Sequence, residues 1–367
     1  MREASTSGDM TIAVVLGRNG NGGSEGQAKM LVAGLRGRGH SVLVVLVEGD
    51  GGTQGFGDAR VETLLPHRTR GLRALIEVSR ASWKLRRILK AGRYEVVHAI
   101  MARAYIIAPL IARTLRDRPR VVAWRRNEGV HVSTRAELLL ERMSARTTDV
   151  IACNSRSGVD YWAANGVTNK TRVEVIPNAL EEWRFLPASR SAGVPSARAR
   201  VLAVGGLKPV KNHELIIEAV AMLPAEVAPE IVILGEGGHR EFLAERARFR
   251  GVKLILPGHV SDPRPWMNSS DLYIQSSTSE GLSNALLEAM AQGMAVIASD
   301  VGGTREALEH AGVLVAPGDA HHLADEMYRL LLDADRRSVL AREAREVARA
   351  NCALDSVLDR HEAIYGG

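Results

Sequence analysis

Aromatic residues and cysteines are both scarce in this sequence of 367 residues. Phe, Trp and Tyr make up only 4% of it, which argues against a protein that binds single-stranded nucleic acid by base stacking. The two cysteines, Cys153 and Cys352, have no metal-binding or redox spacing. No apolar run approaches the roughly 18 residues of a membrane span, and the polar start MREASTSGDM has no apolar signal region. We therefore expect a cytoplasmic protein.

The charge is distributed unevenly along the chain. The net charge is +6, but residues 1–185 carry +11 and the remainder −5. Residues 68–93 hold nine Arg and Lys and one acid, Glu77, with apolar residues at helical spacing. Such a basic amphipathic helix can lie on an anionic membrane surface, here the inner face of the membrane. The alternatives are an ordinary surface helix with an Arg-rich face and a nucleic-acid site, which we do not expect because no binding motif accompanies the charge.

The first half alternates buried strands with glycine loops and helices, as an α/β domain does. A strand at 11–16, the loop GRNGNGGSEG, a helix at 24–36 and a strand at 41–47 open it. Further strands are predicted at 94–99, 120–124, 148–154 and 173–178. Because the carboxyl ends of parallel strands line the ligand site, His98 and residues 125–128 are expected on the functional side, with His131 as a neighbour.

The opening loop partly matches the dinucleotide fingerprint G-x-G-x-x-G. Gly20 and Gly22 fit, but Glu25 stands where the third glycine belongs. Glu48 and Asp50 follow at roughly the distance of a ribose-binding acid. An NAD-dependent dehydrogenase is therefore one alternative.

The second half repeats the same order after residues 187–200, which are rich in Ser, Ala and Pro and resemble a linker. Its predicted strands lie at 201–204, 230–234, 253–256, 271–275, 294–299 and 312–315. A chain with 46% hydrophobic residues and this length can form two α/β cores.

Residues 276–306 of this half, SSTSEGLSNALLEAMAQGMAVIASDVGGTRE, form the most informative stretch. They predict a loop, a helix from about 284 to 292 capped by Ser283 or Asn284, a stop at Gly293 and a buried strand. The backbone N–H groups of Gly281, Leu282, Ser283 and Asn284 would point at a phosphate, because a helix start attracts anions.

Two carboxylates, Glu280 and Glu288, border this turn. On one helix they would be about 12 Å apart along its axis. That exceeds the separation of about 5 Å in a retaining glycoside hydrolase. We therefore expect them to contact two parts of one elongated, phosphate-containing ligand, unless both are ordinary surface acids.

The pattern E-G-x-x-N-x-x-x-E-A-x-A-x-G, followed by a strand, D-V-G-G and a Glu, resembles the signature of family 4 glycosyltransferases. It runs from Glu280 to Glu306 in this sequence. The resemblance implies the GT-B fold: two Rossmann-like α/β domains facing across a cleft, with a C-terminal helix crossing back. The acceptor domain would be 1–180 with about 352–367, and the nucleotide-sugar donor domain 181–351.

The resemblance also implies an activity. A retaining, metal-independent enzyme would move a sugar from a UDP-sugar or, less favoured, a GDP-sugar to a glycan, a lipid-linked or a small-molecule acceptor, with no cofactor. A nucleotide-sugar epimerase or hydrolase of the same fold, and a non-catalytic membrane-associated binding protein, are the alternatives.

Roles for individual residues in the donor domain follow from the same resemblance. Glu280 would hold the donor sugar, Glu288 the ribose and Lys211 the diphosphate, and backbone atoms at Val260 would hold the base. The family motif V-G-R-L-x-x-x-K-N has its arginine replaced by Gly206, and Lys208 is the candidate substitute.

In the first domain, Gly22 and Gly23 resemble the family's loop at the donor phosphates. His98 resembles a catalytic histidine. The second histidine that often follows it is Ile100 here.

Overall fold

The computed structural model describes residues 9–20, 22–49, 54–66, 72–126, 135–168, 171–187 and 198–366. The chain forms two compact units, Met1–Ala179 with Leu354–Gly367, and Leu180–Ala353. Most of the predicted linker, residues 188–197, lies outside the described part of the chain.

Unit 1 contains a parallel sheet that has seven strands within the described residues, in the order β3-β2-β1-β4-β5-β6-β7. The strands are β1 (Thr11–Arg18), β2 (Ser41–Glu48), β3 (Arg60–Leu65), β4 (Val96–Ile100), β5 (Arg120–Arg125), β6 (Val150–Cys153) and β7 (Arg172–Val175). The sequence predicted all of these but β3, which is an edge strand. Its pattern RVETLL mixes charged and apolar residues, and only Leu64 and Leu65 are buried.

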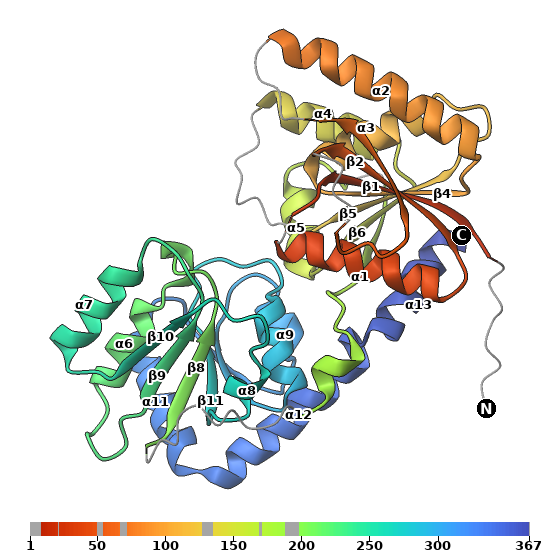
Figure 1. Ribbon diagram of the computed structural model, residues 1–367. Coiled ribbons are helices and arrows are strands. Elements are labelled where there is room, and N and C mark those ends of the chain that lie inside the picture. The colour runs from red at the N-terminus through yellow and green to blue at the C-terminus, as the bar shows by residue number, and fades with distance from the viewer. Residues whose placement is uncertain are drawn as a thin grey trace, which may run out of the picture. The chain divides into compact units, whose positions relative to one another are not determined.

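Helices cover both faces of this sheet (Figure 1). They are α1 (Gly23–Gly37), α2 (Leu72–Gly92), α3 (Ala102–Ala112), α4 (Arg135–Ala145), α5 (Arg156–Ala164) and α13 (Leu354–Gly366). Alternate side chains of β1 explain the two layers. Ile12 and Val14 pack in the core formed with α1 and α13, whereas Ala13 and Val15 pack with α2 and α3. Because both faces are buried, the strand is a continuous apolar run.

Unit 2 repeats the architecture with the strand order β10-β9-β8-β11-β12-β13 over the residues described. The strands are β8 (Arg200–Val204), β9 (Glu230–Leu234), β10 (Leu254–Gly258), β11 (Leu272–Gln275), β12 (Ala295–Ser299) and β13 (Val313–Val315). The helices are α6 (Glu214–Ala221), α7 (Arg240–Arg250), α8 (Arg264–Met267), α9 (Asn284–Ala291), α10 (Thr304–Leu308), α11 (Ala320–Leu332) and α12 (Ala334–Cys352), with 3-10 turns η1 (Glu182–Phe185) and η2 (Pro209–Lys211).

The chain passes between the units twice, and the two passages are side by side. Leu180 N donates to Cys352 O at 2.6 Å in unit 2. After Ala353 the closing helix α13 belongs to unit 1, where Val357, Leu358 and Tyr365 join the core. The predicted return of the last helix to the first domain is therefore confirmed.

Candidate functional site

The site in unit 2 begins at the point where the strand order reverses. β8 is hydrogen-bonded to β11, so the loops that follow these two strands lie next to each other at the carboxyl edge of the sheet. This is where open α/β sheets bind ligands. The loop after β8 ends in Lys211, and the loop after β11 carries Glu280.

Lys211 and Glu280 form an ion pair between these two loops. Ser277 Oγ also donates to Glu280 Oε1 at 2.7 Å. The loops are joined along their backbones as well, because Thr278 N donates to Val210 O at 2.9 Å and Ser276 Oγ to Lys211 O at 3.0 Å. The structure thus brings two predicted catalytic side chains into direct contact, on two loops that are hydrogen-bonded to each other.

The D-V-G-G turn holds the Glu280 loop in place. Gly302 has a φ of +52°, and a Cβ atom there would lie 1.7 Å from Glu280 O. Gly303 N donates to Gly281 O at 2.7 Å. Only glycine allows this approach, so the turn and the acidic loop form one unit.

The helix start follows immediately in the sequence. α9 begins at Asn284, its N-cap Ser283 accepts a hydrogen bond from Leu286 N at 3.4 Å, and Gly293 beyond its end has a φ of +70°. The predicted helix and both of its signals are confirmed. Gly281, Leu282, Ser283 and Asn284 stand at its start, where helix geometry favours an anion.

Glu288 is placed on the next turn of α9 and belongs to a second ion pair. Its Oε2 lies 3.3 Å from Arg184 Nη1. Burial raises the pKa of Glu288, the Arg184 guanidinium lowers it, and the carboxylate of Asp262 raises it again. Glu280 is on the loop before the helix and pairs with Lys211, whereas Glu288 is on the helix and pairs with Arg184. Each of the two acids therefore has its own cation.

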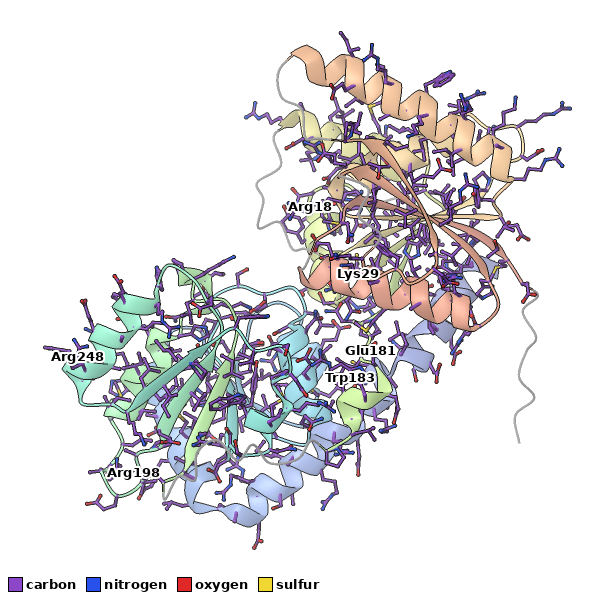
Figure 2. All side chains as sticks on the ribbon, viewed as in Figure 1. Arg18, Lys29, Glu181, Trp183, Arg198 and Arg248 are labelled. Carbon is purple, nitrogen blue, oxygen red and sulfur yellow. The ribbon has the colours of Figure 1, made fainter. Side chains whose placement is uncertain are left out.

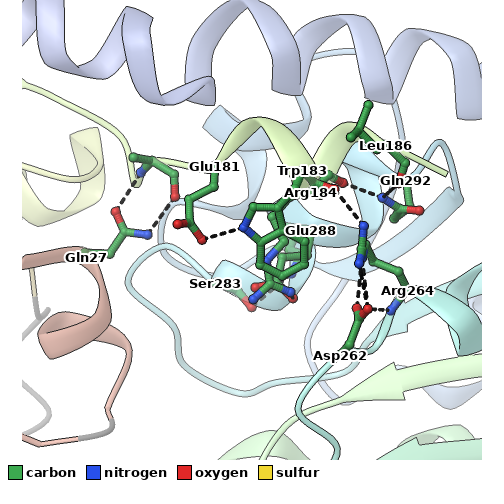
Figure 3. Close-up of polar contacts among 12 residues, drawn as sticks. Gln27, Glu181, Trp183, Arg184, Leu186, Asp262, Arg264, Ser283, Glu288 and Gln292 are labelled. Carbon is green, nitrogen blue, oxygen red and sulfur yellow. Dashed lines mark hydrogen bonds and ion pairs between the residues drawn. The ribbon is translucent and has the colours of Figure 1, made fainter. Parts of the chain in front are cut away.

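Sequence reasoning missed the residues around Arg184. Its guanidinium lies 4.0 Å from the ring centroid of Trp183, and that of Arg264 lies 4.4 Å from the same ring (Figure 3). Arg264 also chelates Asp262, with Nη2 to Oδ2 at 2.7 Å. Trp183 and Arg184 belong to the segment EEWRF, residues 181–185, and its adjacent Trp and Arg were the available signal.

Lys208 lies beside Gly206, the residue that stands where the family motif has an arginine. A Cβ atom on Gly206 would lie 3.6 Å from Lys208 Cε, so the lysine stem runs beside the position where the family's arginine would start. Within the part of the chain that the structure describes, no side-chain partner of Lys208 is recorded. Val260 follows β10 on the same edge and packs on the core beside α9.

The glycine loop of unit 1 opens α1, with Gly22 as its N-cap. Arg126 Nη1 donates to Gly23 O at 3.0 Å, and its Nη2 to Asn178 Oδ1 at 2.7 Å. The Glu25 carboxylate lies over the loop, 2.5 Å from where a Cβ atom of Gly22 would be. The helix start therefore already has a carboxylate beside it, which is ion-paired with Arg18. Its contact with donor phosphates stays a prediction.

The prediction that His98 lies on the functional side, at the carboxyl end of its strand, is wrong. β4 does not end there but continues to Ile100, and His98 is completely buried in the layer under α13. Its Nδ1 is 2.5 Å from Tyr365 Oη, and its ring packs against those of Trp124 and His361. Burial lowers its pKa well below the usual value. His98 is a core residue of unit 1.

The other candidate residues of the first domain are buried, ion-paired or outside the described residues. Arg125 is buried, with its guanidinium 4.2 Å from the Tyr105 ring centroid, so it supports the core and not the edge of the sheet. Glu48, the candidate ribose acid of an NAD site, is ion-paired with Arg103. Asp50, Asn127, Glu128 and His131 lie outside the described residues.

Among the described residues, no three His, Cys, Asp or Glu side chains are grouped so that they could hold a metal ion. None of the helices in this part of the chain combines the length and the apolar character of a membrane span.

Two family descriptions match the two halves of the chain. "Glycosyl transferase 4-like domain" matches residues 22–179, and "Glycosyl transferases group 1" matches residues 188–347. Together with two Rossmann-like units and the paired acids at the switch point, they define a glycosyltransferase of the GT-B fold. The chain belongs to family 4 of these enzymes.

Two curated relatives are each less than 30% identical to this chain. The lipopolysaccharide core biosynthesis glycosyltransferase LpsE of Rhizobium meliloti is 28% identical over 59% of this chain and 64% of its own length. The D-inositol 3-phosphate glycosyltransferase of Salinispora tropica is 29% identical over 75% of this chain and 64% of its own. The chain thus spans somewhat less than two thirds of the length of these relatives.

Solved structures share the fold. Anabaena HepE in complex with UDP has a TM-score of 0.81 at 20% identity, covering 97% of this chain and 100% of its own. The sucrose-phosphate synthase of Thermosynechococcus elongatus has a TM-score of 0.78 at 20% identity, covering 97% and 98%. The predicted GT-B fold is confirmed.

Proposed function

We propose that this protein is a retaining glycosyltransferase that moves a sugar from a nucleotide-sugar donor to a sugar-containing, lipid-linked or small-molecule acceptor. The observation that carries the proposal is the pairing of Lys211 with Glu280 at the switch point of unit 2, on the loop that leads into α9, whose second turn carries Glu288. A cation and a helix start suit a diphosphate, and two separate carboxylates can accept hydrogen bonds from sugar hydroxyls.

The leaving diphosphate would be stabilised by positive groups fixed before the reaction. Lys211, Lys208 and the backbone amides of residues 281–284 would face the charge that develops on it, and such preorganised donors are often the largest catalytic contribution. Because these groups supply the charge, we propose transfer without a metal or another cofactor. The role of Gly22 and Gly23 as phosphate contacts rests on the family resemblance of their loop.

The remaining residues would hold the two ends of the donor. Glu280 would accept hydrogen bonds from the sugar hydroxyls and Glu288 from the ribose, while backbone atoms at Val260 would contact the base. His98 has no part in this proposal, because its ring is enclosed in the core. The retention of anomeric configuration rests on family membership.

A UDP-sugar is the favoured donor, and a GDP-sugar the second choice. Anabaena HepE, which has the same fold, was solved with UDP and with UDP-glucose. For the acceptor, the relatives' names range from lipopolysaccharide core to inositol phosphate and a diphospho-undecaprenol glycan. These three names contain a sugar, a cyclitol or a lipid-linked glycan, whereas a further relative is named an N-acetyl-alpha-D-glucosaminyl L-malate synthase.

The exposed face of α2 supports contact with an anionic membrane. Ile76, Arg80, Trp83 and Arg87 follow the spacing of one helical stripe, and Ile76 and Trp83 are 59% and 62% exposed. The opposite face packs Ala81 and Leu85 into the core. Figure 2 shows long side chains projecting from α2 away from the sheet. Exposed Trp with Arg is the composition of an interfacial helix.

Vesicle sedimentation tests this contact. Wild-type protein should pellet with phosphatidylglycerol vesicles and not with phosphatidylcholine vesicles, and Arg80→Glu with Trp83→Ala should remove the binding. The matched control, Arg248→Glu with Phe249→Ala, changes an exposed cation and an exposed aromatic on α7 and should bind like wild type. Equal loss in both variants would count against α2.

Glu288→Ala tests the transfer site. Donor turnover should be lost while the melting temperature without nucleotide stays near that of wild type, and the exposed α7 variant Glu245→Ala should be fully active. Unchanged turnover in Glu288→Ala would remove the site assignment. Product analysis with and without acceptor separates transfer from the epimerase or hydrolase alternative, because only transfer requires the acceptor.

A further inference from the structure

Arg184 is the cation nearest to Glu288, and it comes from a segment far away in the sequence. η1 carries it, directly after the chain enters unit 2. Arg184 and Glu288 are 19% and 17% exposed in their side chains, so their ion pair is partly shielded from water. A shielded pair is screened less by salt than a surface pair.

The segment around Arg184 is firmly attached to the rest of unit 2. Gln292 Nε2 donates to Arg184 O and, at 3.2 Å, to Leu186 O. Arg345 Nη2 donates to Phe185 O at 2.6 Å, and Arg264 Nη1 to Trp183 O at 2.8 Å. Four backbone carbonyls of the segment are therefore fixed by side chains from α8, from the residue that follows α9 and from α12, so Arg184 does not depend on its own side chain for its position.

The Arg184 guanidinium is also oriented, because it stacks on the Trp183 ring at 4.0 Å. Trp183 Nε1 in turn donates to Glu181 Oε2 at 2.9 Å. Figure 3 shows Arg184 and Trp183 gathered beside Glu288. A guanidinium that is already stacked on a ring loses less entropy when it pairs with a carboxylate.

The surroundings explain why Glu288 needs this partner. Its neighbours from other elements are Arg184 on η1, Asp262 before α8 and Tyr273 on β11. Asp262 is itself chelated by Arg264, and the burial of Tyr273 keeps its pKa far above neutral. Arg345 and Arg349 of α12 contact Phe185 O and Glu182. Arg184 is thus the cation that acts on Glu288 among the described groups.

We propose that Arg184 is a positioning residue that keeps Glu288 ionised and oriented to accept the two ribose hydroxyls of the donor. The inference rests on the proposed function of Glu288. A protonated carboxyl group donates one hydrogen bond and accepts fewer, so it holds a diol poorly. Burial and Asp262 both favour the protonated form of Glu288, and Arg184 opposes them.

The first experiment needs no ligand. The pKa of Glu288 is measured by NMR on protein with ¹³C-labelled glutamate carboxyls, and Glu288→Gln identifies the resonance. In Arg184→Gln the pKa should rise by at least one unit, and in Arg184→Lys it should stay closer to wild type. An unchanged pKa in Arg184→Gln overturns the inference, whether or not the protein binds nucleotides.

The second experiment measures UDP binding by calorimetry in a double-mutant cycle. Arg184→Gln should weaken UDP at pH 8 because Glu288 is no longer held in place, and by up to about a further tenfold at pH 6, because below the pKa each pKa unit reduces the ionised fraction by a factor of ten. In the Glu288→Gln background the same change should have little effect at either pH. The ratio of variant to parent cancels the ionisation of UDP itself.

The outcomes separate the two proposals. Equal, pH-independent losses in both backgrounds would mean that Arg184 only supports the fold, and Arg184→Lys would then fail to restore binding. A wild-type protein that binds neither UDP nor GDP would contradict the proposed function, while the NMR result would still decide the role of Arg184.

Discussion

The replacement of the family's arginine by Gly206 permits a direct test of how this protein binds the donor diphosphate. Lys208 has its stem beside Gly206 and no recorded side-chain partner among the described residues. If its ammonium contacts a phosphate, removal in Lys208→Ala costs one charge-assisted hydrogen bond, about 1.5–3 kcal/mol. That corresponds to about 10- to 100-fold in kcat/KM for the donor.

The structure also predicts that an arginine can be restored. A Cβ atom at residue 206 would lie 3.6 Å from both Glu236 O and Lys208 Cε, which are ordinary van der Waals contacts, and Gly206 has no left-handed φ. Gly206→Arg should therefore fold normally. In the Lys208→Ala background, where the lysine stem is gone, it should recover most of the lost activity because a guanidinium can bind phosphate in a bidentate manner.

The assay is initial-rate kinetics with a UDP-sugar at varied salt, with melting temperatures as the control for folding. Lys208→Ala should raise the donor KM and reduce its salt dependence, and Gly206→Arg/Lys208→Ala should reverse both. Wild-type kinetics in Lys208→Ala would show that the lysine does not contact the donor. An inactive but folded double variant would refute the reasoning about the position of the arginine.

Two further predictions concern the scaffold. Gly302→Ala should lower the free energy of unfolding by about 2 kcal/mol or more and reduce donor turnover, because the new methyl group would clash with Glu280 O at a residue with positive φ. Chemical denaturation and kinetics measure the two effects, and full activity would refute the prediction. Burial lowers the pKa of His361 to about 3 and of His213 to about 4, below the unfolded value of about 6.5. The unfolded state then binds more protons, so stability should be complete above about pH 6.5 and fall toward pH 4, and urea midpoints that are equal at pH 7.5 and 5 would contradict this.

The strands of both units were predictable from the sequence because both faces of each sheet are covered. A strand buried on both sides is a continuous apolar run, and EIVIL at 230–234 was located to the residue. β3 was missed for the opposite reason, since an edge strand needs fewer apolar residues and RVETLL has no clear pattern.

His98 shows where sequence reasoning fails for a site. The run YEVVHA looks like a strand that ends in a polar residue, which is the usual position of a functional group. The partner that explains this histidine is Tyr365, which is 267 residues away. A buried histidine that bonds to a distant tyrosine has no local signal, and the same holds for Arg184, whose relation to Glu288 exists only in the folded unit.

The ion pairs of unit 2 have a consequence for donor binding. Glu280 and Glu288 each have a cation from another segment, Lys211 and Arg184, so the two acids are already neutralised before any ligand arrives. A diphosphate that recruits Lys211 must compete with Glu280, and part of its interaction energy is lost in separating that pair. Glu280 is then released toward the sugar hydroxyls, which are its proposed ligands. Binding of the diphosphate and orientation of the sugar would thus be one coupled step. A nucleoside diphosphate without the sugar would leave the Glu280 carboxylate with the hydrogen bond from Ser277 and without a replacement for Lys211. We therefore expect Glu280→Gln to weaken a UDP-sugar more than UDP, and equal effects on both ligands would show that the pair does not open.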